Sequence, residues 1–424
     1  MRKQLNIRQY GAIEGGKHLC TKAIQMAIDD AATCGGQVYV PSGIYLTGAL
    51  FLKSNTSLYL SEGAVLLGTN CEDQYPIVSG RVAGIEMDWP AAVINVRDAT
   101  DVRISGPGVI DGQGEYWWEK YWGKDRRGGM RASYEKKGLR WAVDYDCFRV
   151  RNVVVLNSEN INLEGFHSKR SGFWNIHICY SSNVTVREIQ ISDNHGPSTD
   201  GIDIDSCNHV LIEKCVISCN DDNICVKSGR DADGLRTARI CENVTIQNCT
   251  IYEGEGITLG SETSGGIRNI RILNNRYKGT KNGFRLKSAK TRGGVIENIT
   301  VENLHMLDVA HPFSFQFNWY PKYSYCEIPQ DYKGEIPNYW QKLVQKVPAE
   351  QGIPHARNIT VKNVTATLQE KYDGESEAFC IEGLEEKPLE NITFEEVNIQ
   401  AKKFGRIINV SGIHFNQVKI ESKM

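Results

Sequence analysis

The chain has 424 residues, of which 41% are hydrophobic, and a formal net charge of -2. Such a chain can bury a large core, and its charge excludes a strongly basic surface for nucleic acid or anionic lipid. Residues 1–10 are polar and charged, and no apolar run has membrane-spanning length. We therefore expect no nucleic-acid or membrane partner. We also expect a cytoplasmic location, or a periplasmic or secreted one if a signal has been removed.

The thirteen cysteines are scattered and contain no CxxC pair, so they predict neither a disulfide framework nor a zinc site. Six of them fall in strand-like runs, where a free thiol acts as a small apolar side chain: Cys179, Cys207, Cys215, Cys225, Cys241 and Cys249. Buried free thiols favour a reducing compartment. We expect no metal ion and no cofactor, and the sequence does not define an oligomeric state.

An amphipathic helix is predicted over residues 21–32, because apolar residues recur there at helical spacing on one face. Gly35 and Gly36 follow and form a helix-stop signal. Residues 1–36 are therefore predicted to cap the exposed end of a repetitive core. The next predicted elements are three short strands, at residues 37–40, 57–60 and 64–68.

A phrase in which Asn precedes alternating apolar residues recurs through the second half of the chain. It begins at Asn160, Asn183, Asn243, Asn269, Asn298, Asn358 and Asn391, with a variant at Asn208. Most spacings lie between 23 residues (160 to 183) and 35 residues (208 to 243). One short strand per repeat of this length indicates a solenoid, in which the asparagines form a structural ladder. We predict one solenoid domain over residues 1–424, without a linker.

Two stretches interrupt this rhythm, residues 115–146 and residues 312–354. The first contains four tryptophans and many charges, and the second contains Phe313, Trp319, Tyr320, Tyr323 and Tyr325. Both are too long for simple turns, so they are predicted to be loop insertions over a groove. Packing of the aromatic side chains against the solenoid explains the same pattern equally well.

Four blocks, in chain order, resemble the signature of glycoside hydrolase family 28, the polygalacturonase family. They are Ser198-Thr199-Asp200, where the family has Asn-Thr-Asp; Asp221-Asp222; Gly254-Glu255-Gly256, where it has Gly-His-Gly; and Arg285-Leu286-Lys287. Residues 38–48 and 106–118 also look like the first coils of that family. The resemblance covers nearly the whole chain, and four blocks in order are far more specific than any one alone.

The resemblance implies an all-β fold, a single-stranded right-handed parallel β-helix, and hydrolysis of a pectic glycan with inversion of configuration. It implies that Asp221 is the general acid and that Asp200 and Asp222 position and deprotonate the attacking water. Arg285 and Lys287 would hold a substrate carboxylate. No metal ion or cofactor takes part in that reaction.

The chemistry of the residues agrees with these roles. Hydrolysis with inversion needs one protonated carboxyl and one carboxylate, about 6.5–9.5 Å apart. Crowding of Asp200, Asp221 and Asp222 on adjacent rungs keeps one carboxyl protonated near neutral pH. Asp221 and Asp222 are consecutive and would point to opposite faces of a regular strand. We therefore expect a turn or bulge there, which Asn220 and Asn223 favour.

Further groove residues are predicted beside this cluster. Arg285 and Lys287 lie two residues apart and so share one face of a strand, where they suit a uronate or balance the aspartates. Asp203 and Lys227 are predicted to face the groove, although a charged solenoid surface explains them nearly as well. Tyr320 is a candidate to contact a sugar, with loop packing as an equal alternative.

Glu255 is the main departure from the family pattern, because it adds a fourth carboxyl where the family has an imidazole. It would repel galacturonan unless Arg285 and Lys287 offset its charge, or it would bind the hydroxyls of a less charged sugar such as rhamnose. His195, close to Asp200 in the sequence, is a candidate to replace the imidazole, although a lone loop histidine is more often structural.

The leading hypothesis is an inverting glycoside hydrolase that acts on galacturonic-acid-containing pectic glycans, from a chain end, of galacturonidase or rhamnogalacturonan type. Two other hypotheses fit the same residues. In the first, the protein is a pectate-lyase-like enzyme whose acids bind calcium. In the second, it is a non-catalytic glycan-binding β-helix in which Glu255 marks a decayed site.

Overall fold

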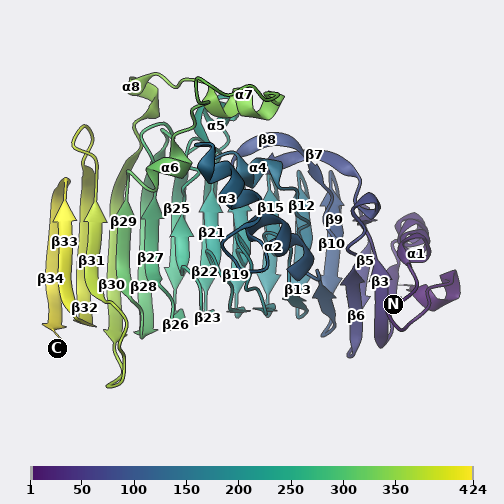
Figure 1. Cartoon of the computed structure of the whole chain (residues 1–424). Helices are drawn as coiled ribbons and strands as arrows, with labels where there is room; N and C mark the ends of the chain where they lie inside the picture. The colour runs from purple at the N-terminus through teal and green to yellow at the C-terminus, as the bar shows by residue number, and fades with distance from the viewer. Residues whose placement is uncertain (1–2, 423–424) are drawn as a thin grey trace.

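The computed structural model describes residues 3–422, and its strands stack side by side along one axis from the N-terminal to the C-terminal end (Figure 1). Among these residues the strands form a sheet of 21 strands, a sheet of 11 strands and a two-stranded hairpin. Neighbouring strands in the large sheets run parallel, whereas the hairpin is antiparallel. Parallel strands joined by crossovers wind right-handed, so the predicted right-handed parallel β-helix is confirmed.

The 11-stranded sheet contributes one strand to each coil and carries the residues of greatest interest. Its strands are β4 (Leu50–Leu52), β9 (Ile94–Arg97), β12 (Val153–Leu156), β15 (Ile176–Cys179), β18 (Ile202–Asp205), β21 (Ile224–Lys227), β24 (Ile257–Leu259), β27 (Asn282–Lys287), β29 (His311–Gln316), β31 (Glu377–Glu382) and β33 (Lys403–Ile408). Alternate side chains, such as Ile202 and Ile204, are fully buried in the core, and the residues between them face outward.

The 21-stranded sheet forms the rest of each coil, as two rows of strands in the N-terminal two thirds. Its strands are β1 (Gln4–Asn6), β2 (Gln37–Val40), β3 (Gly43–Thr47), β5 (Ser57–Leu60), β6 (Ala64–Gly68), β10 (Thr100–Ser105), β11 (Val109–Asp111), β13 (Glu159–Glu164), β14 (His167–Lys169), β16 (Ser182–Arg187), β17 (Gln190–Ser192), β19 (Asn208–Glu213), β20 (Val216–Ile217), β22 (Cys241–Gln247), β23 (Thr250–Ile251), β25 (Ile267–Leu273), β26 (Arg276–Lys278), β28 (Val295–Leu307), β30 (His355–Thr367), β32 (Leu389–Ala401) and β34 (Val410–Ser422). The two rows merge at β28, which pairs with both β25 and β26.

The N-terminal elements match their predictions closely. Helix α1 (Thr21–Cys34) is two residues longer than predicted and ends at Gly35, whose φ of 61° is left-handed. Its buried side chains are Ile24, Ala27, Ile28 and Ala31, and it lies at the N-terminal end of the stack (Figure 1). The three predicted strands are β2, β5 and β6, with the predicted bounds. The helix therefore covers the end of the core, as expected of a cap.

The predicted asparagine ladder is present over six rungs. Each side-chain amide donates to the oxygen of the preceding asparagine, at 2.8–3.3 Å, from Asn391 through Asn358, Asn298, Asn269 and Asn243 to Asn208. Five of these residues, all but Asn208, have φ between 52° and 59°, a left-handed conformation that Asn tolerates better than most residues. Asn160 and Asn183 lie outside the ladder and donate instead to Asp101 and Glu159.

Several short helices lie outside the coils. They are η1 (Ile7–Tyr10), η2 (Glu72–Gln74), α2 (Glu115–Trp122), α3 (Gly129–Lys136), α4 (Val143–Asp146), α5 (Asp231–Thr237), α6 (Pro321–Ser324), α7 (Asn338–Val344) and α8 (Ala349–Gly352). The first predicted insertion thus folds into α2, α3 and α4 rather than an irregular loop. The second begins later than predicted, at Phe317, because residues 311–316 form β29 and Phe313 is a core side chain there.

The hairpin of β7 (Ile77–Val82) and β8 (Ile85–Pro90) was not predicted. It lies along the upper edge of the stack, near α4 and α7 (Figure 1). Trp89 of β8 is fully buried and packs against Phe148 and Phe173, with ring centroids 5.0 and 5.7 Å away. The hairpin is therefore fixed to the body of the molecule by a core of its own.

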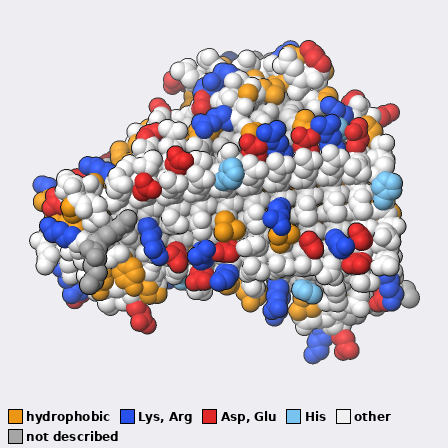
Figure 2. Space-filling model, turned by 180° about the vertical axis from the view of Figure 1, so that it is seen from behind, with side chains coloured by type: hydrophobic (Ala, Val, Ile, Leu, Met, Phe, Trp, Pro, Cys, Tyr) orange, Lys and Arg blue, Asp and Glu red, His pale blue; other side chains and the backbone are white. Residues whose placement is uncertain are grey.

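On the face shown in Figure 2, basic and acidic side chains are interspersed. Oppositely charged side chains on the surface also form pairs, such as Arg357 and Glu297, which lie 2.7 Å apart. All thirteen cysteines are free thiols, and the six predicted to act as apolar side chains are buried. Within residues 3–422, none of the helices combines the length and the apolar character needed to span a membrane.

Candidate active site

Three aspartates meet where two neighbouring strands of the 11-stranded sheet begin. Asp200 lies two residues before β18, and Asp221 and Asp222 lie just before β21. Ile202 pairs with Ile224, so Asp200 lies beside Asp222, and the amide of Gly201 donates to the carbonyl of Asp222 at 2.9 Å. The backbone turns before β21, which allows consecutive carboxyls to face one place. The juxtaposition predicted from the sequence is therefore present.

The three carboxyls are close together. One oxygen atom of each lies within 4.8 Å of one oxygen of the other two. This nearest-oxygen separation is shorter than the carboxyl spacing of about 6.5–9.5 Å predicted for inversion. Neighbouring rungs of a parallel sheet are only about 4.8 Å apart, which accounts for the closeness. Carboxyls this near one another cannot all be ionised without a large electrostatic cost.

Asp222 is held in its ionised form by two cations. Its Oδ2 lies 2.6 Å from Nζ of Lys287, its Oδ1 lies 3.7 Å from a guanidinium nitrogen of Arg285, and Thr258 donates to Oδ1 at 2.6 Å. Burial alone raises the pKa of Asp222, but Lys287 and then Arg285 outweigh it and hold the pKa at about 2. Asp222 is thus a carboxylate at any ordinary pH.

The pKa values of Asp221 and Asp200 are raised, in contrast to that of Asp222. Burial, and then the charge of Asp222, raises the pKa of Asp221 to about 6. Burial, followed by the charges of Asp203 and Asp221, raises the pKa of Asp200 well above its usual value. The cluster therefore holds a proton donor and a carboxylate together. Asp222 is better suited than Asp200 to accept a proton from water, because it alone is fully ionised.

Lys227 joins the cluster to a buried acidic group. Its Nζ lies 3.2 Å from Asp203, 3.4 Å from Glu262 and 3.6 Å from Asp200, and 4.3 Å from the ring centroid of Trp174. Burial raises the pKa of Asp203 to about 7, although Lys227 opposes the shift. Asp203 and Lys227 are 0% and 4% exposed, so they are not simple surface charges, and Lys227 lines the space over the three aspartates.

The negative charge of Glu255 is offset by neighbouring cations. Its carboxylate accepts hydrogen bonds from Arg285 at 2.7 Å, Asn282 at 2.8 Å and Lys281 at 3.0 Å. The predicted offset of its charge by Arg285 is therefore present, and Lys281 adds to it. Lys287 instead pairs with Asp222. Both predicted uronate-binding cations are thus already engaged with carboxylates of the protein.

A small cavity of about 150 Å³ lies over the aspartates. Its walls come from the hairpin tip at Ala83, from Arg140 in the first insertion, and from Trp319 and Tyr320 in the second. The guanidinium of Arg140 lies 5.6 Å from the ring centroid of Tyr320, and Nζ of Lys287 lies 4.6 Å from that of Trp319. The segments outside the coils therefore close the space around the carboxyls on one side.

Comparison with known proteins identifies this arrangement. The sequence pattern of glycosyl hydrolases family 28 matches residues 36–332, which is more than half of the chain. The chain belongs to glycosyl hydrolases family 28. The match includes the aspartates, Glu255, Arg285, Lys287 and Tyr320, and it confirms the family resemblance seen in the sequence blocks.

Individual relatives of this family 28 protein agree with the assignment. It is 29% identical over 403 residues to a probable polygalacturonase of Vitis vinifera, which covers 92% of this chain and 73% of the relative. It is 28% identical to an exo-poly-alpha-D-galacturonosidase of Dickeya chrysanthemi, over 73% of this chain and 56% of that one. Its fold is similar to that of an exopolygalacturonase of Thermotoga maritima, with a TM-score of 0.79, 28% identity, and coverage of 98% and 92%.

The role of His195 as a replacement for the imidazole at residue 255 stays a prediction. His195 is exposed and lines a second cavity of about 430 Å³, together with Glu255 and Lys281. Three residues of the family 28 site were missed by sequence reasoning: Glu262, Trp174 and Arg140. Glu262 and Trp174 stand outside the repeated phrase, and Arg140 reaches the site from an insertion. Local patterns therefore carried no signal for them.

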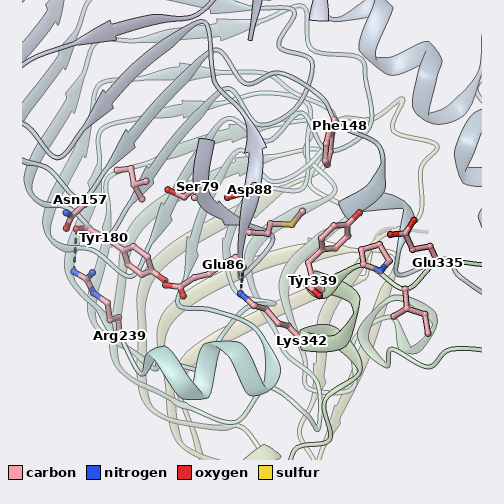
Figure 3. Close-up of a pocket in the computed structure, with 16 residues that line it drawn as sticks. Ser79, Glu86, Asp88, Phe148, Asn157, Tyr180, Arg239, Glu335, Tyr339 and Lys342 are labelled. Carbon is pink, nitrogen blue, oxygen red and sulfur yellow. Dashed lines mark hydrogen bonds between the residues drawn. The ribbon is translucent and has the colours of Figure 1, made fainter. Parts of the chain in front are cut away.

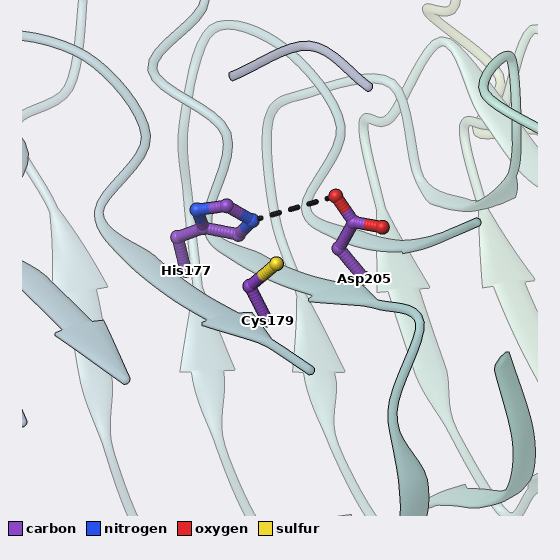
Figure 4. A group of neighbouring side chains, drawn as sticks. All are labelled: His177, Cys179 and Asp205. Carbon is purple, nitrogen blue, oxygen red and sulfur yellow. Dashed lines mark ion pairs between the residues drawn. The ribbon is translucent and has the colours of Figure 1, made fainter. Parts of the chain in front are cut away.

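A buried network lies under the hairpin, next to the active site. His177, Cys179 and Asp205 project from neighbouring strands of the 11-stranded sheet, and the imidazole Nε2 lies 3.7 Å from the carboxylate of Asp205 (Figure 4). Arg81 of β7 lies 3.2 Å from Asp205, and Arg151 lies 2.6 Å from Nδ1 of His177. Burial lowers the pKa of His177 to about 4. The two arginines make this group unsuited to a metal cation, and the network instead fixes the hairpin over the sheet.

A wider cavity of about 1000 Å³ lies beyond the hairpin, away from the aspartates. Glu86 and Asp88 of β8, Tyr180 after β15, and Tyr339 and Lys342 of α7 line it (Figure 3). Tyr180 donates to Glu86 at 3.0 Å and Lys342 donates to the carbonyl of Glu86 at 2.5 Å. These contacts join the hairpin to α7, so the cavity belongs to the packing of the two covering segments.

Proposed function

We propose that the protein hydrolyses pectic glycans that contain galacturonic acid and that it removes sugars from a chain end. The observation that carries the proposal is the small cavity over Asp200, Asp221 and Asp222, which the hairpin and both insertions enclose on one side. A space of about 150 Å³ suits one terminal sugar better than the middle of a long chain. The family, and the exo-acting relatives within it, support the same mode.

In the proposed mechanism, Asp221 donates its proton to the glycosidic oxygen while a water attacks the opposite face of the sugar. Its pKa of about 6 keeps a large share of the acid form in mildly acidic solution. Asp222, ionised through Lys287 and Arg285, orients and deprotonates the water. Asp200 positions that water with it. Water attack without a covalent intermediate inverts the anomeric configuration.

The pairing of Arg285 with Glu255 favours a second candidate substrate, in which the sugar next to the cleaved bond is not a uronate. A guanidinium that already binds a carboxylate at 2.7 Å has less capacity to bind a uronate. A neutral sugar such as rhamnose at that position would instead meet the hydrogen-bonding oxygens of Glu255. The reaction is then hydrolysis of a mixed galacturonate and rhamnose chain.

Calcium-dependent elimination is less well supported. A calcium ion at the aspartates would lie next to Lys287, 2.6 Å from Asp222, and Lys227, 3.6 Å from Asp200. Two ammonium groups at such distances disfavour a divalent cation. A decayed, non-catalytic site would not require the opposed pKa values of Asp221 and Asp222.

We also propose a reducing compartment such as the cytoplasm, which the thirteen free thiols support.

Product analysis tests the proposal. The protein is incubated with defined oligogalacturonides and with rhamnogalacturonan oligosaccharides, and products are separated by size and by charge. Release of monosaccharide from one end is the expected result, and proton NMR of the first product identifies the inverted anomer. A ladder of sizes would refute the exo mode, and an unsaturated product that absorbs in the ultraviolet would refute hydrolysis.

A further inference from the structure

The cavity of about 430 Å³ beside the active site runs along the helix axis, and we name it the turn groove. Its lining residues come from the turns that precede six successive strands, β18, β21, β24, β27, β29 and β31. They include His195, Asn220, Glu255, Lys281, Asp308 and Tyr372. The turn groove thus crosses several coils in the direction of the C-terminal end.

One end of the turn groove adjoins the catalytic acid. Asn220 lines the groove and directly precedes Asp221 in the chain. The amide of Glu255, another lining residue, donates to the carbonyl of Asp221 at 2.9 Å. A glycan whose terminal sugar occupies the small closed cavity must continue on an open side. The turn groove offers such a path directly beside the bond to be broken.

Tyr372 forms the other end of the turn groove. It lies in the turn between β30 and β31, which extends below the strands in Figure 1. Asp308 anchors this turn, because its carboxylate accepts from the amide and the side chain of Gln369 at 2.8 and 2.6 Å. The hydroxyl of Tyr372 donates to the carbonyl of Glu375 at 2.9 Å. The aromatic ring is therefore held in place and lines the groove while partly exposed.

The distance between the two ends is that of an oligosaccharide. Strands β21, β24, β27, β29 and β31 are consecutive neighbours in the sheet, so four rungs separate the turn of Asp221 from that of Tyr372. At about 4.8 Å per rung this is about 19 Å, which only a chain of several sugars can span. Nζ of Lys402 lies 5.5 Å from the Tyr372 ring centroid. An ammonium beside an aromatic ring suits the face and the carboxylate of a uronate.

We propose that the turn groove binds the part of the pectic chain that leaves on hydrolysis, and that Tyr372 stacks on a sugar several units from the cleaved bond. The proposal rests on the proposed function, since it assumes a glycan with its terminal sugar at the aspartates. Its consequence is a preference for longer substrates, because only these reach Tyr372. Shorter ones use the same catalytic groups without that contact.

The test compares Tyr372→Ala with the wild type on a series of oligogalacturonides or mixed oligosaccharides of increasing length. The expected result is a KM about tenfold higher for the long members, with kcat unchanged and with no effect on disaccharide hydrolysis. Tyr372→Phe, which keeps the ring, retains most of the length preference. Tyr39→Ala serves as a matched control, because Tyr39 is a partly exposed tyrosine of β2 at the far end of the molecule. Equal kinetics of Tyr372→Ala and wild type on long substrates would overturn the proposal.

Calorimetric binding to Asp221→Asn separates this proposal from the proposed function. If the wild type cleaves no glycan of the series but longer members bind more tightly through Tyr372, the function is wrong and the binding groove stands. If the wild type cleaves them and length preference does not depend on Tyr372, the groove assignment alone is wrong. Loss of binding to long and short members alike in Tyr372→Ala would also contradict it.

Discussion

Asp221 and Asp222 are consecutive residues, yet their surroundings give them opposite protonation. Asp222 is buried and Asp221 is half-buried, and the loss of solvation by itself favours the neutral acid of each. Lys287 contacts only Asp222 directly, so one carboxyl becomes a strong acid while its neighbour keeps a proton to about pH 6. At the scale of single residues, Lys287 together with Arg285 thus gives the two consecutive carboxyls different protonation states.

Asp221→Asn removes the proton donor without changing the shape of the side chain. We expect kcat to fall by about 10³-fold, the usual worth of a general acid. Asp193→Asn is the matched control, because Asp193 is an exposed aspartate in the turn that precedes the neighbouring strand, β18. Near-normal turnover by Asp221→Asn, measured as sugar release, would remove Asp221 from the mechanism.

The pH dependence of both activity and stability follows from the raised pKa of Asp221. The acid form of Asp221 is required, so activity should decline as pH rises through about 6. The folded pKa also lies above the ordinary value of 3.8, so the folded state binds more protons than the unfolded state between about pH 4 and pH 6. Stability from this group is therefore lost as pH rises through that window. Asp221→Asn should stabilise the protein at pH 7 by on the order of 2 kcal/mol. Thermal unfolding of the wild type and of Asp221→Asn at pH 4 and pH 7 tests the sign of this stability change. A variant that is less stable than the wild type at pH 7 would contradict the prediction.

Glu255→Gln tests which sugar lies beside Arg285. The substitution keeps a partner for Asn282 but removes the charge that binds the guanidinium. If the protein binds a uronate there, KM for oligogalacturonides should fall several-fold. If it binds a neutral sugar, KM for the mixed oligosaccharide should rise instead. Glu62→Gln, an exposed position between β5 and β6 near the N-terminal end of the stack, is the control and should alter neither.

At the scale of elements, the coils were predictable and the covering segments were not. Alternating apolar residues after each asparagine specify a strand by local sequence alone, as at β22 and β25. The hairpin β7–β8 has no such phrase, and it is fixed instead by Trp89 and by the ion pair of Arg81 with Asp205, more than a hundred residues away. The catalytic aspartates could be found because they stand in short local blocks. Arg140 and Glu262 could not, because only tertiary packing brings them to the site.

Asn243 provides a test of the ladder at this scale. It donates to Asn208 at 2.9 Å, accepts from Asn269 at 3.2 Å, and has φ of 56°. Asn243→Ala loses both hydrogen bonds and strains the left-handed backbone, so we expect about 2–3 kcal/mol of destabilisation. Asn243→Gly loses the hydrogen bonds but not the left-handed conformation and should cost less. Denaturant unfolding in which Asn243→Gly is less stable than Asn243→Ala would contradict this account.

At the scale of the whole molecule, the solenoid provides a long open surface and the segments outside its coils limit access to it. The hairpin and both insertions gather over one part of the 11-stranded sheet, and the turn that contains Tyr372 lies four rungs further toward the C-terminal end. A polysaccharide therefore reaches the aspartates by its end rather than by its middle.

This arrangement predicts how a solution of polygalacturonate changes during digestion. Reducing ends should accumulate while the viscosity stays nearly constant, because removal of terminal sugars leaves long chains long. Parallel measurement of viscosity and of reducing sugar distinguishes removal of terminal sugars from cleavage of internal bonds. A steep early loss of viscosity would mean that internal bonds are cut.

The asparagine ladder also has a direction. The amides of the five asparagines from Asn391 to Asn243 donate toward the N-terminal end, so the four side chains between Asn391 and Asn208 are both donors and acceptors in one aligned series of dipoles. A single residue inserted within a coil would displace one asparagine from that series and break two of its bonds. Loss or duplication of an entire coil would leave the series intact. The length of such a protein can therefore evolve in steps of one complete turn, with changes of other sizes confined to the connecting loops.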